Sequence, residues 1–171
     1  MDDLALDREY QRGDQGVKVS LIQEWLCLHG FQVVIDGAFG PATEAAVGRF
    51  QSRAGVGVDG IVGDTTFEQL VLPMKRALGP IPPDGANLGA MVVAYAKQHL
   101  AQAPREVGGQ NRGPWVRLYV NGHDGPEWPR CAGFASFILT QACSAIRTTM
   151  AAAKVTRCAS VCGATRARTS S

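Results

Sequence analysis

Apolar residues recur at helical spacing in three stretches of the first half of the chain. Their members are, in chain order, Val17, Leu21, Trp25 and Leu28, then Ala42, Ala46, Val47 and Phe50, and then Phe67, Leu70 and Val71. Gly30 follows the first stretch and Pro73 follows the third, and both residue types are typical of helix ends. The pattern predicts three short helices around one small core, with Trp25 inside that core.

Two short segments between these predicted helices have the same order of residue types. Residues 36–43 and residues 59–66 both read Asp-Gly-x-Φ-Gly-x-x-Thr, where Φ is apolar. Asp-Gly favours a tight turn because glycine accepts a positive φ and aspartate bonds to the following backbone. Pro41 suits the first turn of a helix that starts after the second glycine. We interpret the repeat as turn chemistry that shapes the fold.

These segments together resemble the peptidoglycan-binding domain that is attached to many wall hydrolases. The resemblance rests on residues 16–26 (Gly-Val-Lys-Val-Ser-Leu-Ile-Gln-Glu-Trp-Leu), on both Asp-Gly turns, and on residues 47–51 (Val-Gly-Arg-Phe-Gln). It implies a three-helix module at residues 10–72 that binds peptidoglycan noncovalently and concentrates an attached enzyme on its polymer. The expected wall contacts are exposed side chains beside the turns, and the candidates are Phe31, Phe39 and Gln51.

A different composition follows this module. Residues 73–87 are rich in proline and glycine and predict a semi-rigid linker. An alanine-rich stretch from Leu88 to about Ala103 then predicts a helix that Pro104 ends.

Cys131 directly precedes an apolar run and should therefore lie at the N-terminus of a helix. Unpaired N–H groups and the positive end of the helix dipole favour a thiolate at such a position. Residues 111–119 (Asn-Arg-Gly-Pro-Trp-Val-Arg-Leu-Tyr) and residues 128–136 (Trp-Pro-Arg-Cys-Ala-Gly-Phe-Ala-Ser) are similar to wall-lytic cysteine peptidases and amidases of the CHAP and NlpC/P60 type, as found in phage lysins. The resemblance implies that residues 88–142 are the N-terminal part of such a domain, with Cys131 at the position of the nucleophile.

A cysteine nucleophile needs an imidazole that takes its proton, and that partner is missing here. In the families named, the histidine follows the cysteine, whereas His29, His99 and His123 all precede Cys131. His123, in a glycine-rich turn, is the candidate for a displaced base. The expected fold class is therefore mainly α, with the three-helix module followed by a truncated papain-like α+β domain of which mostly the helices remain.

Three functions stay open at this point. The first is a wall-binding protein, the targeting part of a lysin-like hydrolase whose catalytic domain is incomplete. The second is an active cysteine amidase or endopeptidase that cleaves peptidoglycan with Cys131. The third is a helical interaction protein without wall contact. The sequence leaves open the target species, the wall bond and the oligomeric state.

The last segment differs from the rest in charge. The net charge is +2, yet Glu127 is the last acidic residue, so residues 143–171 form a basic tail with no aromatic side chain. Its composition resembles out-of-frame translation, although a helix from Cys131 to about Val155 is compatible with its many alanines. Scattered basic residues are weak support for nucleic-acid binding, and no nucleic-acid partner is expected.

Membrane, export and cofactor signals are lacking in the sequence. No apolar run reaches the roughly 18 residues that a membrane span needs. The acidic N-terminus lacks the order of a secretory signal, so we expect synthesis in the cytoplasm and action at the wall after release. The five cysteines have irregular spacings, and no histidine lies near Cys158 and Cys162, so the sequence predicts neither a disulfide framework nor a zinc site, and no cofactor is expected.

Overall fold

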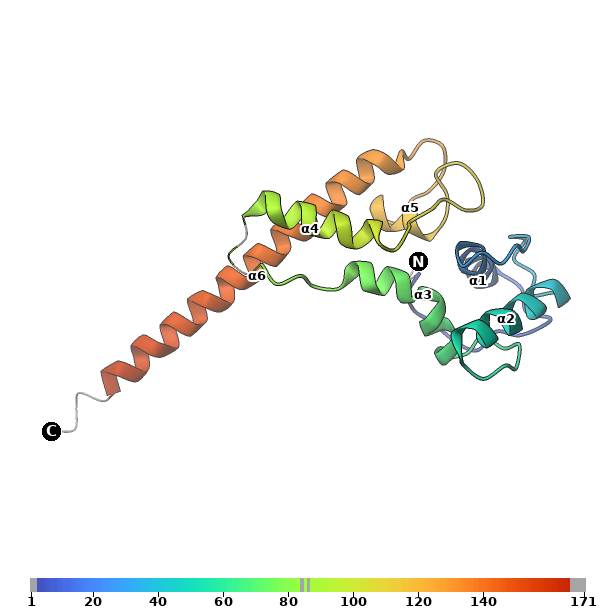
Figure 1. The fold of residues 1–171 in the computed structure, drawn as a ribbon, viewed down its shortest axis with the longest axis horizontal. Coiled ribbons are helices and arrows are strands. Elements are labelled where there is room, and N and C mark those ends of the chain that lie inside the picture. The colour runs from blue at the N-terminus through green and yellow to red at the C-terminus, as the bar shows by residue number, and fades with distance from the viewer. Residues whose placement is uncertain (1–2, 84, 86, 167–171) are drawn as a thin grey trace.

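A computed structural model describes residues 3–83, 85 and 87–166, with side chains described as far as Thr148. It contains six α-helices: α1 (Val17–Leu28), α2 (Pro41–Ala54), α3 (Asp64–Leu78), α4 (Leu88–Leu100), α5 (Pro114–Tyr119) and α6 (Arg130–Arg166) (Figure 1). The described residues form no strand, only isolated bridges between Tyr10 and Val62 and between Gln15 and Ala38. The fold is thus mainly helical, as expected, and the papain-like character of its second half stays a prediction.

The three predicted helices of the first half are present as α1, α2 and α3, and they share one apolar core. The core includes Val19, Leu21, Ile22, Trp25, Leu26, Phe39, Ala46, Val47, Phe50, Val62, Phe67, Leu70, Val71 and Met74. Trp25 is only 1% exposed, which confirms its predicted place in the core. Removing these apolar side chains from water is the main force that holds the short helices together.

The prediction that the third helix ends before Pro73 is wrong. Proline usually breaks a helix because it has no N–H and its ring crowds the preceding turn. Here α3 continues through Pro73 to Leu78, and the buried side chains of Met74 and Ala77 fix its last turns in the core. The boundary placed between residues 72 and 73 therefore lies inside a helix. Of the predicted linker, the described residues 79–83, 85 and 87 lie outside a helix.

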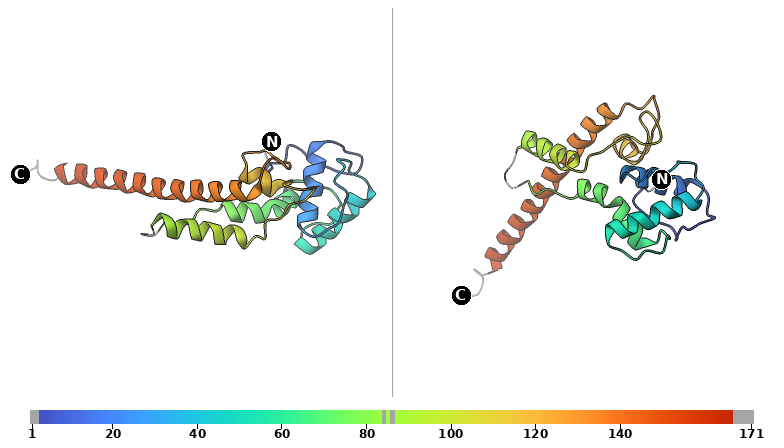
Figure 2. Two further views of the ribbon diagram at one scale, coloured as in Figure 1. Left: turned by 90° about the horizontal axis from the view of Figure 1, so that it is seen from above. Right: turned by 45° about the vertical axis from the view of Figure 1, so that its right-hand side comes forward.

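The second half packs onto the first at two places. Helix α5, which the sequence pattern did not predict, places Trp115 and Tyr119 in the same core as α1 to α3. A second apolar cluster joins α4 and α6 through Met91, Tyr95 and Ile138. Helix α6 crosses α4 and then projects away from the rest of the molecule (Figure 2). Its end at Arg166 lies beyond the predicted limit near Val155.

A buried ionic cluster also connects the two halves. Arg117 on α5 contacts the carboxylates of Asp3 at 2.6 Å, Glu24 on α1 at 2.5 Å and Asp124 at 3.0 Å. All four side chains are at least three-quarters buried. Burial raises the pKa of Glu24 despite its hydrogen bonds to Arg117, and the neighbouring Asp3 and Asp124 act in the same direction.

None of the helices in the described part of the chain has the length and hydrophobicity that a membrane span needs.

Candidate functional site

Gln23, on α1, organises the first Asp-Gly turn from inside the core. Its Nε2 donates to Asp36 Oδ1 at 2.8 Å, to the carbonyl oxygen of Ala38 at 3.1 Å and to Thr43 Oγ1 at 3.2 Å. Its Oε1 accepts from the backbone N–H groups of Asp36 and Gly37 at 3.1 and 2.9 Å. A single buried amide therefore fixes the turn and the start of α2.

Gln51, on α2, repeats this arrangement in the second turn. Its Nε2 donates to Asp59 Oδ1 at 2.7 Å, to the carbonyl oxygen of Ile61 at 2.9 Å and to Thr66 Oγ1 at 3.0 Å. Its Oε1 accepts from the N–H groups of Asp59 and Gly60 at 3.2 and 3.0 Å. The sequence repeat thus corresponds to a structural repeat, in which the aspartate and the threonine of each copy bind the same glutamine.

Hydrogen bonds within the turns lower the pKa values of the two turn aspartates. A backbone hydrogen bond from Ala38 lowers the pKa of Asp36, and one from Ile61 lowers the pKa of Asp59, with the glutamine side chains adding to both effects. The glycine after each aspartate has φ 75°, a conformation that side chains with a Cβ rarely adopt. The repeat therefore has the structural role that we inferred from its turn chemistry.

Two of the three candidate wall contacts are not on the surface. Gln51 is 0% exposed, and its side-chain amide forms its hydrogen bonds with the turn. Phe39 is 2% exposed and lies in the core. The expectation that these two side chains are exposed is wrong, because the residues beside the turns point inward and fill the space between the helices. Sequence reasoning also missed Gln23, although a glutamine precedes both copies of the repeat.

Phe31 is the candidate that remains at the surface. Its ring is partly exposed and lies edge-on to Phe50, with a centroid distance of 6.1 Å. The guanidinium of Arg53 lies 4.3 Å from the Phe31 centroid, within the range of a cation–π contact, and Arg49 lies 6.0 Å away. A partly exposed aromatic ring with a guanidinium over it therefore lies beside the end of α2.

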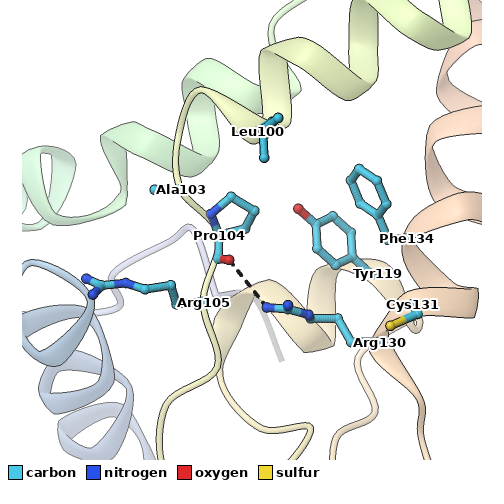
Figure 3. A pocket seen from close by; sticks show the side chains of 8 residues that line it. All are labelled: Leu100, Ala103, Pro104, Arg105, Tyr119, Arg130, Cys131 and Phe134. Atoms are coloured by element: carbon cyan, nitrogen blue, oxygen red, sulfur yellow. Dashed lines mark hydrogen bonds between the residues drawn. The ribbon is translucent and has the colours of Figure 1, made fainter.

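Cys131 lies where the sequence predicted it, near the N-terminus of α6. It is exposed and lines a cavity of about 390 Å³ (Figure 3). The other lining residues are Leu100, Ala103, Pro104, Arg105, Tyr119, Arg130 and Phe134. The Arg130 guanidinium donates a hydrogen bond to the Pro104 carbonyl at 3.3 Å and lies 3.5 Å from a carboxylate oxygen of Glu106. The cavity is thus mainly apolar, with two guanidinium groups among its lining residues.

The histidines of the described chain do not line this cavity. His99 is buried, with its ring nitrogens 3.1 Å from the Tyr119 hydroxyl and 3.1 Å from Gln141 Oε1, and burial lowers its pKa. His123 stacks on Trp128 at 4.2 Å between ring centroids. The structure therefore does not bring His123, the candidate displaced base, to the cavity beside Cys131. Within the same residues, no group of histidine, cysteine and acidic side chains could hold a metal ion.

Comparison with known proteins matches one segment of the chain to a described family. Residues 15–70 match the family described as "Putative peptidoglycan binding domain". A stretch of 41 residues is 58% identical to the zinc D-Ala-D-Ala carboxypeptidase of Streptomyces albus G, and it covers 24% of this chain and 16% of that enzyme. The chain thus spans less than a fifth of the length of this relative.

Two solved structures are also similar to part of the chain. The SleB N-terminal domain is 37% identical, and the match covers 39% of this chain and 93% of that one, with a TM-score of 0.38. The Burkholderia AP3 phage endolysin is 32% identical, and the match covers 41% of this chain and 31% of that one, with a TM-score of 0.37.

Proposed function

We propose that this chain, which carries a peptidoglycan-binding domain at residues 15–70, attaches to the bacterial cell wall as the targeting part of a lysin-like wall hydrolase. The family match is the observation that supports the proposal. The matched residues lie within the part of the chain that forms α1 to α3 and their shared core. Relatives of this domain include a D-Ala-D-Ala carboxypeptidase and a phage endolysin. Because the chain covers only a small part of these proteins, only wall attachment is carried over to it.

Phe31 is the contact that we propose for this attachment. An exposed aromatic ring can cover the apolar face of a sugar or a peptide side chain at a small entropic cost. Arg53 holds the ring in place from one side and Phe50 from another. The surface is therefore preorganised before the polymer binds, which lowers the cost of association.

Sedimentation with purified sacculi tests the proposal. We expect the full chain to enter the pellet with sacculi and to stay in solution with cellulose. Phe31→Ala should weaken binding by roughly fivefold, since aromatic anchors contribute about 1 kcal/mol or more at interfaces. Val34→Ala is the matched control, because Val34 is 72% exposed in the same loop and should leave binding unchanged. A chain that stays in solution with sacculi would contradict the proposal.

A second function, cleavage of a wall peptide amide by Cys131, is favoured by one observation. The thiol is exposed at a helix N-terminus and borders an apolar cavity large enough for a side chain of the substrate. Attack by the thiolate needs a base that takes the thiol proton, and no histidine lines this cavity in the described part of the chain.

Turbidity of the same sacculus suspensions distinguishes the two functions. We expect the wild-type chain to leave the turbidity unchanged, because no histidine is among the described residues that line the cavity. Clearing of the suspension by the wild type, and its loss in Cys131→Ala, would instead establish a cysteine hydrolase.

A further inference from the structure

A small cavity of about 190 Å³ lies where the ends of α1 and α2 meet α3. Phe50 and Arg53, which both contact the Phe31 ring, line this cavity, but Phe31 itself does not. Its lining residues are His29, Phe50, Arg53, Ala54, Gln69, Leu72, Pro73 and Arg76. The proposed function assigns no role to this cavity.

The cavity is cationic. Arg53 and Arg76 are exposed at its rim, and neither forms an ion pair with a carboxylate in the part of the chain that the structure describes. No acidic residue is among those that line it. Both arginines belong to the last turns of α2 and α3, where the helix dipole stabilises a cation. That position explains why two positive charges are tolerated here without an acidic partner.

One of the two guanidinium groups is fixed in place. Arg53 Nη2 donates to the carbonyl oxygen of His29 at 2.8 Å, and the guanidinium stacks on Phe31. A guanidinium has five N–H donors, so this bond leaves most of them available to a ligand. Such a planar group binds a carboxylate through two parallel hydrogen bonds.

The His29 side chain forms an uncharged part of the cavity lining. Its Nε2 donates to the carbonyl oxygen of Leu70 at 2.8 Å, and its ring lies 4.9 Å from that of Phe50. Burial lowers the pKa of His29, and the nearby charge of Arg53 acts in the same direction. At neutral pH the cavity therefore presents two arginine charges around a neutral aromatic wall.

We propose that this cavity binds a free carboxylate of the peptide part of peptidoglycan. The inference rests on the proposed wall binding and names the chemical group that the domain recognises there. The sugar rings of the wall polymer bear few charges, whereas its peptides end in carboxylates, and a carboxylate fits the planar guanidinium of Arg53. Phosphate groups of other wall polymers are the competing source of negative charge, and the test separates the two.

The test compares two double variants that remove the same charge. Arg53→Gln with Arg76→Gln should weaken binding to sacculi by about tenfold, since two exposed charge-assisted contacts are lost. Arg112→Gln with Arg147→Gln removes two exposed arginines outside the cavity and should leave binding unchanged. Thermal unfolding of both variants checks that the fold is intact.

Chemical treatment of the sacculi tests the ligand without any variant. Amidation of the wall carboxylates should reduce wild-type binding to the level of the Arg53→Gln, Arg76→Gln variant. Removal of phosphate polymers with hydrofluoric acid should leave the binding of the wild-type protein unchanged. The carboxylate proposal is overturned if wild-type protein sediments but amidation has no effect, or if phosphate removal alone abolishes the difference between the variants. Failure of the wild type to sediment would instead overturn wall binding itself.

Discussion

Gln51→Glu is expected to lower the free energy of unfolding by about 3–4 kcal/mol, because a buried donor becomes an acceptor. The side-chain amide nitrogen of Gln51 donates to Asp59, Ile61 and Thr66, all of which offer an oxygen. A glutamate would place a second carboxylate against Asp59 inside the protein and leave these oxygens without their donor. Gln23→Glu should have a similar effect, since the first turn uses the same geometry.

Urea unfolding followed by circular dichroism measures this effect. Gln32→Glu is the matched control, because Gln32 is exposed and the same change there should cost less than about 0.5 kcal/mol. Equal stability of the Gln51 and Gln32 variants would show that the buried amide does not hold the turn. The defect of Gln51→Glu should also shrink at low pH, because a protonated carboxyl can again donate a hydrogen bond.

Arg117→Met is expected to destabilise the chain by about 3–5 kcal/mol at pH 7, since it removes one partner from a buried ionic cluster. Asp3, Glu24 and Asp124 would then face one another without the guanidinium that they share. Methionine keeps much of the length of the arginine side chain, so the loss of stability reflects the missing charge more than missing packing. Arg112→Met, on an exposed residue of the same region, is the control and should be close to neutral.

The pH dependence of this variant follows from the direction of the Glu24 pKa. The pKa of Glu24 is raised in the folded protein, so the folded state holds its proton more tightly than the unfolded state. The stability that protonated Glu24 contributes is therefore lost as the pH rises from the ordinary pKa of a glutamate through the raised pKa of Glu24. Without Arg117 the pKa should rise further, so the destabilisation should be smaller at pH 5 than at pH 7. An equal loss of stability at pH 5 and at pH 7 would contradict this account of the cluster.

Hydrophobic spacing was enough to predict most of the helices. The faces that contain Trp25, Phe50 and Leu70 correspond to α1, α2 and α3, and the helix from Leu88 and the one from Cys131 are also present. These predictions succeeded because apolar residues that recur every three or four positions can be buried together only on a helix.

The site was harder to predict, since burial depends on contacts between distant residues. Glutamine is usually exposed, so Gln23 and Gln51 gave no sign that they hold the turns from inside. Pro73 is read as a helix end unless the packing of Met74 is known. The three carboxylates around Arg117 come from three separate segments, and Arg53 and Arg76 come from two helices, so neither cluster is visible as a sequence pattern.

Chemical-shift mapping of the full chain with soluble peptidoglycan fragments tests the central claim most directly. We expect saturable shifts concentrated within residues 15–78, with the largest at Phe31, Arg53 and Arg76, and little change along α4 and α6. Fragments that produce no saturable shift, or shifts confined to the surroundings of Cys131, would contradict the assignment of wall binding to this domain.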